Sequence, residues 1–137
     1  MGADVWSVTS YQQLRADALA AERWNRLHPT EEPRVPYVTS QLAGATGPVI
    51  AATEYVRLVP DMVARFVPQG LIALGTDGFG LSDTRAALRR HFEVDAEHIT
   101  VTALSALAHC GAVPSNLVAS AIVGFGLDPD RPDPVSR

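Results

Sequence analysis

The sequence contains no lysine, since all eleven of its basic residues are arginine. Schiff-base chemistry and the phosphate-binding P-loop both need a lysine amine, so both are excluded. A single cysteine, Cys110, excludes an internal disulfide. No stretch has the roughly 18 consecutive apolar residues that a membrane span needs, and the first ten residues lack the basic start and apolar block of a signal peptide. These absences indicate a cytoplasmic protein.

Positive charge is also scarce. The formal net charge is -4, the isoelectric point is near 5.4, and 19% of the residues are charged. A chain without a basic field is not drawn to phosphate backbones or anionic lipid, so we expect neither nucleic acid nor membranes as partners. The 137 residues, 47% of them hydrophobic, suit one domain with a modest core.

What is present is an alternation of strand and helix patterns. Short apolar runs predict three strands, at residues 4–10, 48–53 and 71–75. Apolar spacing and capping residues predict helices at residues 11–24, from about 59 to 67, from Ser82 to about Asp95, from Asp95 to Gly111, and from 114 to 125. Strands that alternate with helices predict an α/β fold with a small, mainly parallel sheet.

Prolines divide the rest of the chain. Pro33 and Pro36 predict an extended segment on the surface after the first helix. Residues 24–37, which include this segment, are called the crossing. Residues 128–137 hold three prolines and three aspartates, which predicts a flexible tail. We therefore assign residues 1–127 to one domain and residues 128–137 to the tail.

Three blocks of sequence carry a family resemblance. They are ADVWSVTS at residues 3–10, ERWNRLHP and EEPRVPYV between residues 22 and 38, and LGTDGFGLSDTRAALRRHFEVDAEHI at residues 74–99. In this order and spacing the chain resembles the C-terminal domain of the single-chain, homodimeric bacterial pyruvate dehydrogenase E1 components. The resemblance covers most of the chain, and the third block is long and specific.

The resemblance implies a three-layer α/β domain like the C-terminal domain of transketolase. It implies that the full enzyme decarboxylates pyruvate on thiamine diphosphate with Mg²⁺ and transfers the acetyl group to a lipoyl E2 component. The diphosphate-binding signature, GDG followed by an Asn, is missing, so we expect the chain to bind no cofactor or metal and to supply no catalytic residue. It would instead pack against the remaining E1 domains and a second E1 subunit and stabilise the dimer.

The sequence departs from the family in two respects. The family domain begins with an apolar strand and a helix before the ADVWSVTS block, and both are missing here, so we expect the isolated chain to be destabilised or to pair with another chain. Leu81 stands where the family usually has Arg, and a leucine cannot hold an anion.

The glycine loop before the third predicted helix is one candidate site. Its residues are Asp77, Gly78, Phe79, Gly80, Ser82, Asp83 and Arg85. A loop that opens a helix can present backbone N–H groups to an anion. Two aspartates would repel phosphate, however, and G-x-G-x-x-G spacing is absent, so a tight turn and close packing are favoured.

Histidine and cysteine offer weaker candidates. His91 and His98 could act as acid and base, but their spacing is wrong for a zinc helix, and a packing role is favoured, for His91 at a domain or subunit contact. Cys110 is expected to be buried and structural because it lies at a helix end. No G-x-S-x-G elbow supports a hydrolase.

The crossing after the first helix is the predicted interface. Trp24, Arg26, Arg34 and Tyr37 combine aromatic and guanidinium groups, which are enriched where proteins meet. The alternative function is a stand-alone, non-enzymatic interaction or dimerisation module. A small nucleotide-binding domain is a third possibility, for which we expect no binding of ATP or NAD.

Overall fold

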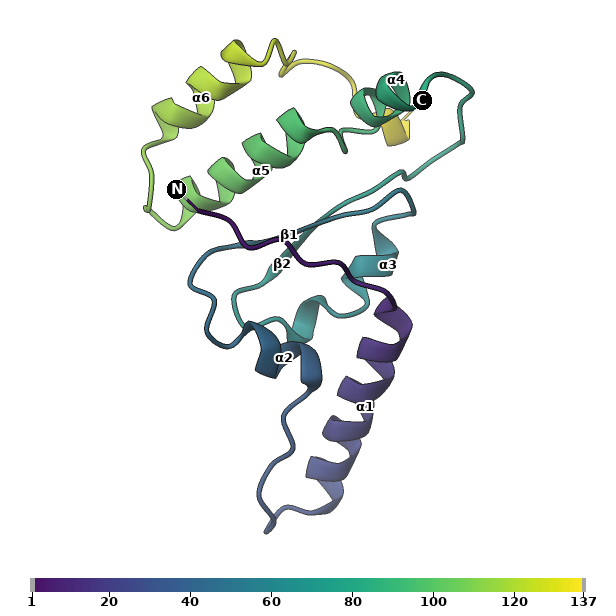
Figure 1. Ribbon diagram of the computed structural model, residues 1–137, viewed down its shortest axis with the longest axis vertical. Coiled ribbons are helices and arrows are strands. Elements are labelled where there is room, and N and C mark those ends of the chain that lie inside the picture. Colours follow the sequence, from purple (N-terminus) through teal and green to yellow (C-terminus); the bar gives the residue numbers. More distant parts are fainter. Residues whose placement is uncertain (1, 137) are drawn as a thin grey trace.

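Figure 1 shows the computed structural model, which describes residues 2–136. The helices are α1 (Tyr11–Leu27), α2 (Tyr37–Leu42), α3 (Leu58–Asp61), α4 (Arg85–His91), α5 (Ala96–His109) and α6 (Ser115–Gly124). The strands are β1 (Val49–Ala52) and β2 (Leu71–Leu74), and the 3-10 turns are η1 (Ala64–Phe66) and η2 (Pro134–Ser136).

The strands form a parallel two-stranded sheet between two layers of helix. Val49 pairs with Leu71 and Ala52 with Leu74. Helices α5 and α6 lie on one side of the sheet, and α1, α2 and η1 lie on the other (Figure 1). The predicted α/β class with a small parallel sheet is therefore confirmed.

Helix α1 confirms the first predicted helix and extends it by three residues, to Leu27. Ser10 caps it, because its side-chain oxygen accepts a hydrogen bond from the N–H of Gln13 at 3.2 Å. Ala18 and Ala21 are its buried positions. These small side chains let α1 lie close to the elements beneath it.

The core is small and lies between α1, α2 and η1. Its buried cluster is Ala18, Val38, Phe66 and Val67. By contrast, neither α5 nor α6 contains a fully buried residue, although both helices are rich in apolar side chains. One side of the sheet is thus packed as in an ordinary domain, and the other is thinly covered.

The strand predicted at residues 4–10 is wrong. This segment has no strand structure, and Val5, Trp6 and Val8 are exposed. β-branched and aromatic residues favour strands, but a strand forms only where a neighbouring strand supplies hydrogen-bond partners. Among residues 2–136 no strand lies against this segment.

Two helix boundaries also differ from the sequence analysis. Thr84, not Ser82, caps α4, because the Thr84 hydroxyl accepts from the N–H of Ala87 at 3.3 Å. The helix predicted from about residue 59 to 67 is divided into α3, which ends at Asp61, and η1, which begins at Ala64. The Asp95 cap of α5 and its end before Gly111, where φ is +76°, are confirmed.

The C-terminal segment lies against the rest of the domain. The Arg131 guanidinium lies 3.3 Å from the Arg90 carbonyl oxygen and 3.0 Å from Nδ1 of His91. The Cα of Val135 lies close to Gly78. These contacts bring the segment beside the ends of the two strands.

Candidate functional site

The two strands end side by side, and the loops after them are joined by hydrogen bonds. The N–H of Thr53 donates to the Leu74 carbonyl at 2.9 Å, and the N–H of Thr76 donates to the Tyr55 carbonyl at 2.9 Å. The Thr76 hydroxyl donates to the Glu54 carbonyl at 2.8 Å. In open α/β sheets ligands bind at the carboxyl ends of the strands, so this edge is the candidate site.

Gly75 permits the close approach of the two loops. A Cβ at this position would lie 2.5 Å from the Tyr55 carbonyl oxygen and 2.9 Å from the Arg57 nitrogen. Sequence reasoning singled out Gly78 and Gly80 and missed Gly75, although its place directly after a strand was a signal. Gly78 does require glycine, since its φ is +91°.

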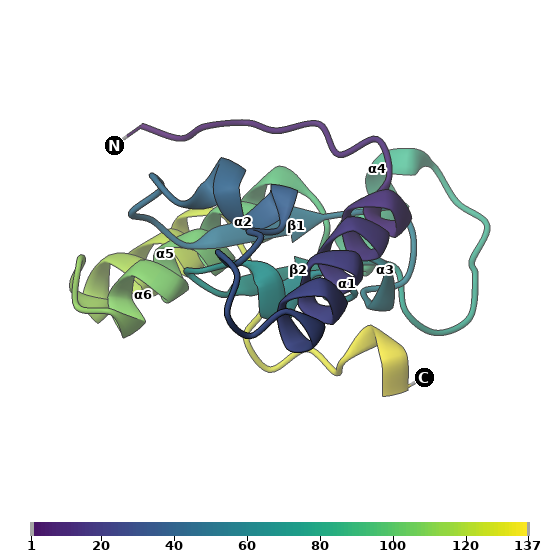
Figure 2. The same ribbon diagram turned by 90° about the horizontal axis from the view of Figure 1, so that it is seen from below.

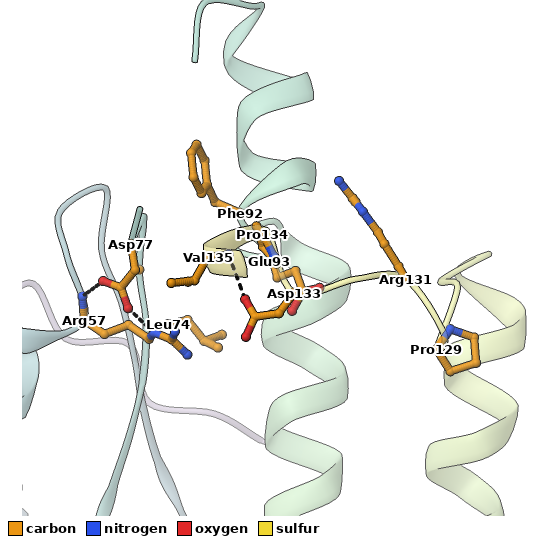
Figure 3. Close-up of a pocket in the computed structure, with 11 residues that line it drawn as sticks. Arg57, Leu74, Asp77, Phe92, Glu93, Pro129, Arg131, Asp133, Pro134 and Val135 are labelled. Carbon is orange, nitrogen blue, oxygen red and sulfur yellow. Dashed lines mark hydrogen bonds and ion pairs between the residues drawn. The ribbon is translucent and has the colours of Figure 1, made fainter. Parts of the chain in front are cut away.

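An ion pair joins the same two loops. Asp77 accepts hydrogen bonds from the backbone N–H of Arg57 at 2.8 Å and from its Nε at 2.5 Å (Figure 3). The side-chain hydrogen bond with Arg57 lowers the pKa of Asp77, and the same bond raises the pKa of Arg57. Asp77, which was counted against an anion ligand at this loop, is thus engaged by Arg57 within the fold.

We predict that Asp77→Asn destabilises the chain by about 1 kcal/mol at neutral pH, the upper range for a partly exposed pair. The pKa of Asp77 is lower in the folded than in the unfolded chain. Its stabilisation is therefore fully present above the ordinary aspartate value of about 3.9 and is lost as pH falls through the folded value. Urea unfolding of both proteins at several pH values measures this, and a difference that stays constant into acid would contradict the assignment.

A second charged cluster lies at the start of α4. Glu54 lies 2.5 Å from the Arg89 guanidinium and 3.8 Å from Nε of Arg85. The hydrogen bond from Arg89, with the charges of both arginines, lowers the pKa of Glu54. A pocket of about 400 Å³ opens beside this cluster, and the exposed Leu81 is one of its lining residues. Glu54 thus has Arg89 as its closer partner, and the side chain of Arg85 stays largely exposed.

The other pocket lies between the strand ends and the C-terminal segment (Figure 3). Its volume is about 290 Å³. Its charged lining residues are Arg57, Arg131, Asp77, Glu93 and Asp133. Acidic groups outnumber basic ones here, which disfavours a phosphate or carboxylate ligand.

The tip of the glycine loop projects from the body. Phe79 is 86% exposed, and Ser82 and Asp83 are exposed as well. The Asp83 carboxylate accepts a hydrogen bond from the N–H of Thr84 at 2.6 Å. Asp83 therefore stabilises the local turn, whereas the Phe79 ring is largely uncovered by residues 2–136.

His91 and His98 lie in different surroundings. His91 meets Arg131 through Nδ1, and its ring lies edge-on to Phe92 with centroids 4.8 Å apart. His98 is paired through Nδ1 with Asp95 at 2.5 Å. The two histidines are therefore held by separate partners.

Arg90 joins the ends of three helices. It donates to the Asp95 carboxylate at 3.1 Å and to the carbonyls of Phe125 and Gly126, each at 3.1 Å. Partial burial raises the pKa of Asp95, but hydrogen bonds from His98 and Arg90 outweigh it and lower the pKa overall. These contacts give Arg90 and Asp95, both in the third sequence block, a structural role.

Cys110 is exposed, which corrects the expectation of a buried thiol. Its Sγ lies 3.2 Å from the Leu107 carbonyl oxygen at the end of α5. The helix ends at the surface and turns away at Gly111, so its last residues have no neighbouring layer to cover them. No cluster of His, Cys, Asp and Glu that could hold a metal occurs within residues 2–136.

The crossing after α1 is folded back on that helix. Trp24 is stacked between His28, at a centroid distance of 4.3 Å, and the Arg34 guanidinium, 4.2 Å from the ring centroid. The Asn25 side chain donates to the Arg34 carbonyl at 2.9 Å and accepts from its N–H at 2.8 Å. The backbone N–H of Tyr37 donates to Asp17.

These contacts separate the four predicted interface residues into two kinds. Trp24 and Arg34 are largely engaged with each other. Arg26 and the Tyr37 ring remain exposed, as does Val35 beside them. The crossing therefore presents an exposed surface that carries the side chains of Val35 and Tyr37.

Comparison with known proteins places this fold in a family. Residues 1–95 match the family described as the transketolase-like TK C-terminal domain. The chain therefore belongs to the transketolase-like C-terminal domain family.

Its curated relatives are pyruvate dehydrogenase E1 components. The chain is 48% identical over 136 residues to that of Pseudomonas aeruginosa, which is 98% of this chain and 15% of the relative. It is 47% identical over 135 residues to that of Escherichia coli K12, with the same two shares. It is 49% identical over 128 residues to that of Mycobacterium tuberculosis, which is 93% of this chain and 14% of the relative.

The match corresponds to the C-terminal part of these enzymes, so the chain spans about 15% of the length of the relatives. The family resemblance inferred from the three sequence blocks is thereby confirmed. In the part of the chain that the structure describes, no helix is both long and apolar enough to cross a membrane.

Proposed function

We propose that this chain acts as the C-terminal, non-catalytic domain of a pyruvate dehydrogenase E1 enzyme. In this role it packs against the remaining E1 domains and stabilises the dimer with a second E1 subunit. The single observation that carries the proposal is the amount of surface that the chain leaves uncovered.

The accessible surface of the chain is 9334 Å². A compact monomer of 14.6 kDa is expected to expose about 6,900 Å². The excess, about 2,400 Å², is several times the roughly 800 Å² that each partner contributes to a standard interface. A domain with so much uncovered surface is built to be covered by other protein.

The character of the uncovered surface supports the same role. Large apolar side chains are exposed on several elements, which monomeric proteins rarely allow over wide areas. They include Val35, Tyr37, Tyr55, Leu58, Phe79 and Val123. The set spreads over the α1 crossing, the strand-end loops and α6, so more than one contact face is supported.

In the whole enzyme, pyruvate would be decarboxylated on thiamine diphosphate with Mg²⁺, and the acetyl group would pass to a lipoyl E2 component. The described residues do not fit this cofactor, because they offer no metal-binding cluster and Asp77 is occupied by Arg57. We therefore place the cofactor in the other domains and assign no catalytic step to this chain. Such an enzyme would be cytoplasmic, with no nucleic acid or membrane partner.

A chimera tests the proposal. The matching segment of the Pseudomonas aeruginosa enzyme is exchanged for this chain, and dimer mass and pyruvate-dependent activity are measured. We expect the chimera to be an active dimer. The double variant Val35→Asp with Tyr37→Asp should weaken both the dimer and the activity, because it would bury two carboxylates in the interface.

Glu32→Gln, a change of an exposed charge on the same crossing, is the matched control and should behave as the parent chimera. A parent chimera that neither dimerises nor turns over pyruvate would refute the proposal. If the Val35 and Tyr37 variant has the same dimer mass and activity as the parent chimera, the crossing is not part of the interface.

A further inference from the structure

The chain that follows α6 lies beside the carboxyl ends of the strands. Residues 128–136, called the strap, run in yellow along the lower side of the view in Figure 2 and end in the turn η2. The Arg131 guanidinium ties the strap to the last residues of α4. Farther along, the Cα of Val135 would lie 3.6 Å from a Cβ at Gly78. Between these contacts the strap forms one wall of the cavity of about 290 Å³ (Figure 3).

The contact between Arg131 and His91 fixes the state of the imidazole. A guanidinium carries only donors, so Nδ1 of His91, which lies 3.0 Å away, is the acceptor. An imidazole nitrogen accepts a hydrogen bond only when it carries no proton, so the ring is neutral and its proton is on Nε2. The contact therefore exists in one protonation state of His91 and in one tautomer.

The charges at this contact are not offset by a carboxylate. None of the ion pairs within residues 2–136 includes His91 or Arg131. On α4 the Arg90 guanidinium donates to the Asp95 carboxylate and to two carbonyls, so only its backbone oxygen meets Arg131. A protonated His91 would thus face a guanidinium with no carboxylate at ion-pair distance.

The acidic groups in the cavity wall belong to other segments. Asp77 is held by Arg57, and the Asp133 carboxylate accepts a hydrogen bond from the N–H of Val135 at 2.9 Å. Glu93, directly after α4, is the third carboxylate in the wall. Two of the three are therefore engaged away from His91, and the third forms no ion pair with it.

We propose that neutral His91 holds the strap closed and that protonation of His91 releases it. A proton from solvent on Nδ1 removes the acceptor and places an imidazolium against the Arg131 guanidinium. The strap then leaves α4, the cavity opens, and Gly78 loses its contact with Val135. Histidine gains charge as pH falls from about 8 to about 5, so the strap is held at neutral and alkaline pH and released in acid.

The release acts on the glycine loop of residues 77–83. The strap packs on this loop at Gly78, whose φ is +91°, and the tip of the loop carries the exposed Phe79. This step rests on the proposed function, in which other E1 domains cover the exposed loop. Release of the strap would loosen that contact, so His91 is a positioning residue that acts through the loop.

Hydrogen exchange measured by mass spectrometry tests the strap in the full-length chimera described above. Peptides that contain residues 128–136 are followed at about pH 8 and about pH 5.5, on the two sides of the range in which histidine titrates. His91→Gln is the matched control, because its side-chain oxygen can accept from Arg131 but cannot take up a proton in this range. Comparison of two proteins at one pH cancels the pH dependence of exchange itself.

At about pH 8 the parent chimera and His91→Gln should exchange the strap at equal rates. At about pH 5.5 the parent should exchange it roughly tenfold faster, the effect of losing one hydrogen bond to a charged group. Arg131→Leu should exchange it fast at both pH values. Peptides from α1 should exchange alike in all three proteins, which separates release of the strap from general unfolding.

Equal exchange of the strap in the parent and His91→Gln at the lower pH would overturn the proposal. Slow exchange of the strap in Arg131→Leu would overturn it as well. The exchange of these peptides is read whether or not the chimera dimerises or turns over pyruvate. This test and the test of the proposed function can therefore fail separately.

Discussion

Gly75→Ala is expected to lower the free energy of unfolding by about 3 kcal/mol, the upper range for overpacking at a tight site. The added Cβ would lie 2.5 Å from the Tyr55 carbonyl oxygen and 2.9 Å from the Arg57 nitrogen. Both neighbours are backbone atoms, so neither can move aside as a flexible side chain would. The loops at the strand ends would separate, and the Arg57–Asp77 ion pair would weaken with them.

Gly124→Ala is the matched control for this prediction. Gly124 lies at the end of α6, and a Cβ there meets nothing within 4 Å. Alanine should raise stability there by about 0.5 kcal/mol, because it restricts the unfolded chain. Urea unfolding of the three proteins measures both effects. Equal stability of the Gly75 and Gly124 variants would show that the loops do not need their close approach.

Phe66→Ala is expected to cost about 3 to 5 kcal/mol, the range for loss of a buried aromatic side chain. Phe66 is part of the small cluster that joins α1 and α2 to the sheet. Its carbonyl oxygen accepts a hydrogen bond from the Thr39 hydroxyl at 2.6 Å, a contact that alanine retains. The expected loss thus comes from the ring, not from the backbone.

Phe79→Ala provides the comparison, since the Phe79 ring is 86% exposed. Its removal should change stability by less than about 0.5 kcal/mol, as is usual at the surface. Because domains are stable by only about 5 to 15 kcal/mol, the Phe66 variant should lose a large share of its stability and melt at a clearly lower temperature. Thermal melts of both variants test this, and equal melting temperatures would place the core elsewhere.

The sequence predicted those elements whose signals are local. The Ser10 and Asp95 caps and the apolar spacing of α1 and α5 act within a few residues, and both helices were found. The strand predicted at residues 4–10 failed because strand formation depends on a partner that no local pattern reveals. The division of the second predicted helix into α3 and η1, around the buried Val63, was likewise not visible in the local pattern.

The candidate site was predicted less well than the fold. The loop motif was located, but the partner of Asp77 was not, because Arg57 lies twenty residues away in sequence. Gly75 was missed because its requirement arises from a second loop, Tyr55 to Arg57, that lies beside it only in the folded chain. Both the Asp77 ion pair and the Gly75 requirement depend on contacts between segments that are distant in sequence, which local patterns do not reveal.

Our proposal makes this chain one part of a longer E1 enzyme. The most direct measurement is the mass of the native polypeptide in its own cells, by immunoblot with an antibody raised against residues 75–95. Since the chain spans about 15% of its relatives, the account predicts a band several times heavier than 14.6 kDa. A band near 14.6 kDa alone would contradict this and favour the stand-alone interaction or dimerisation module instead.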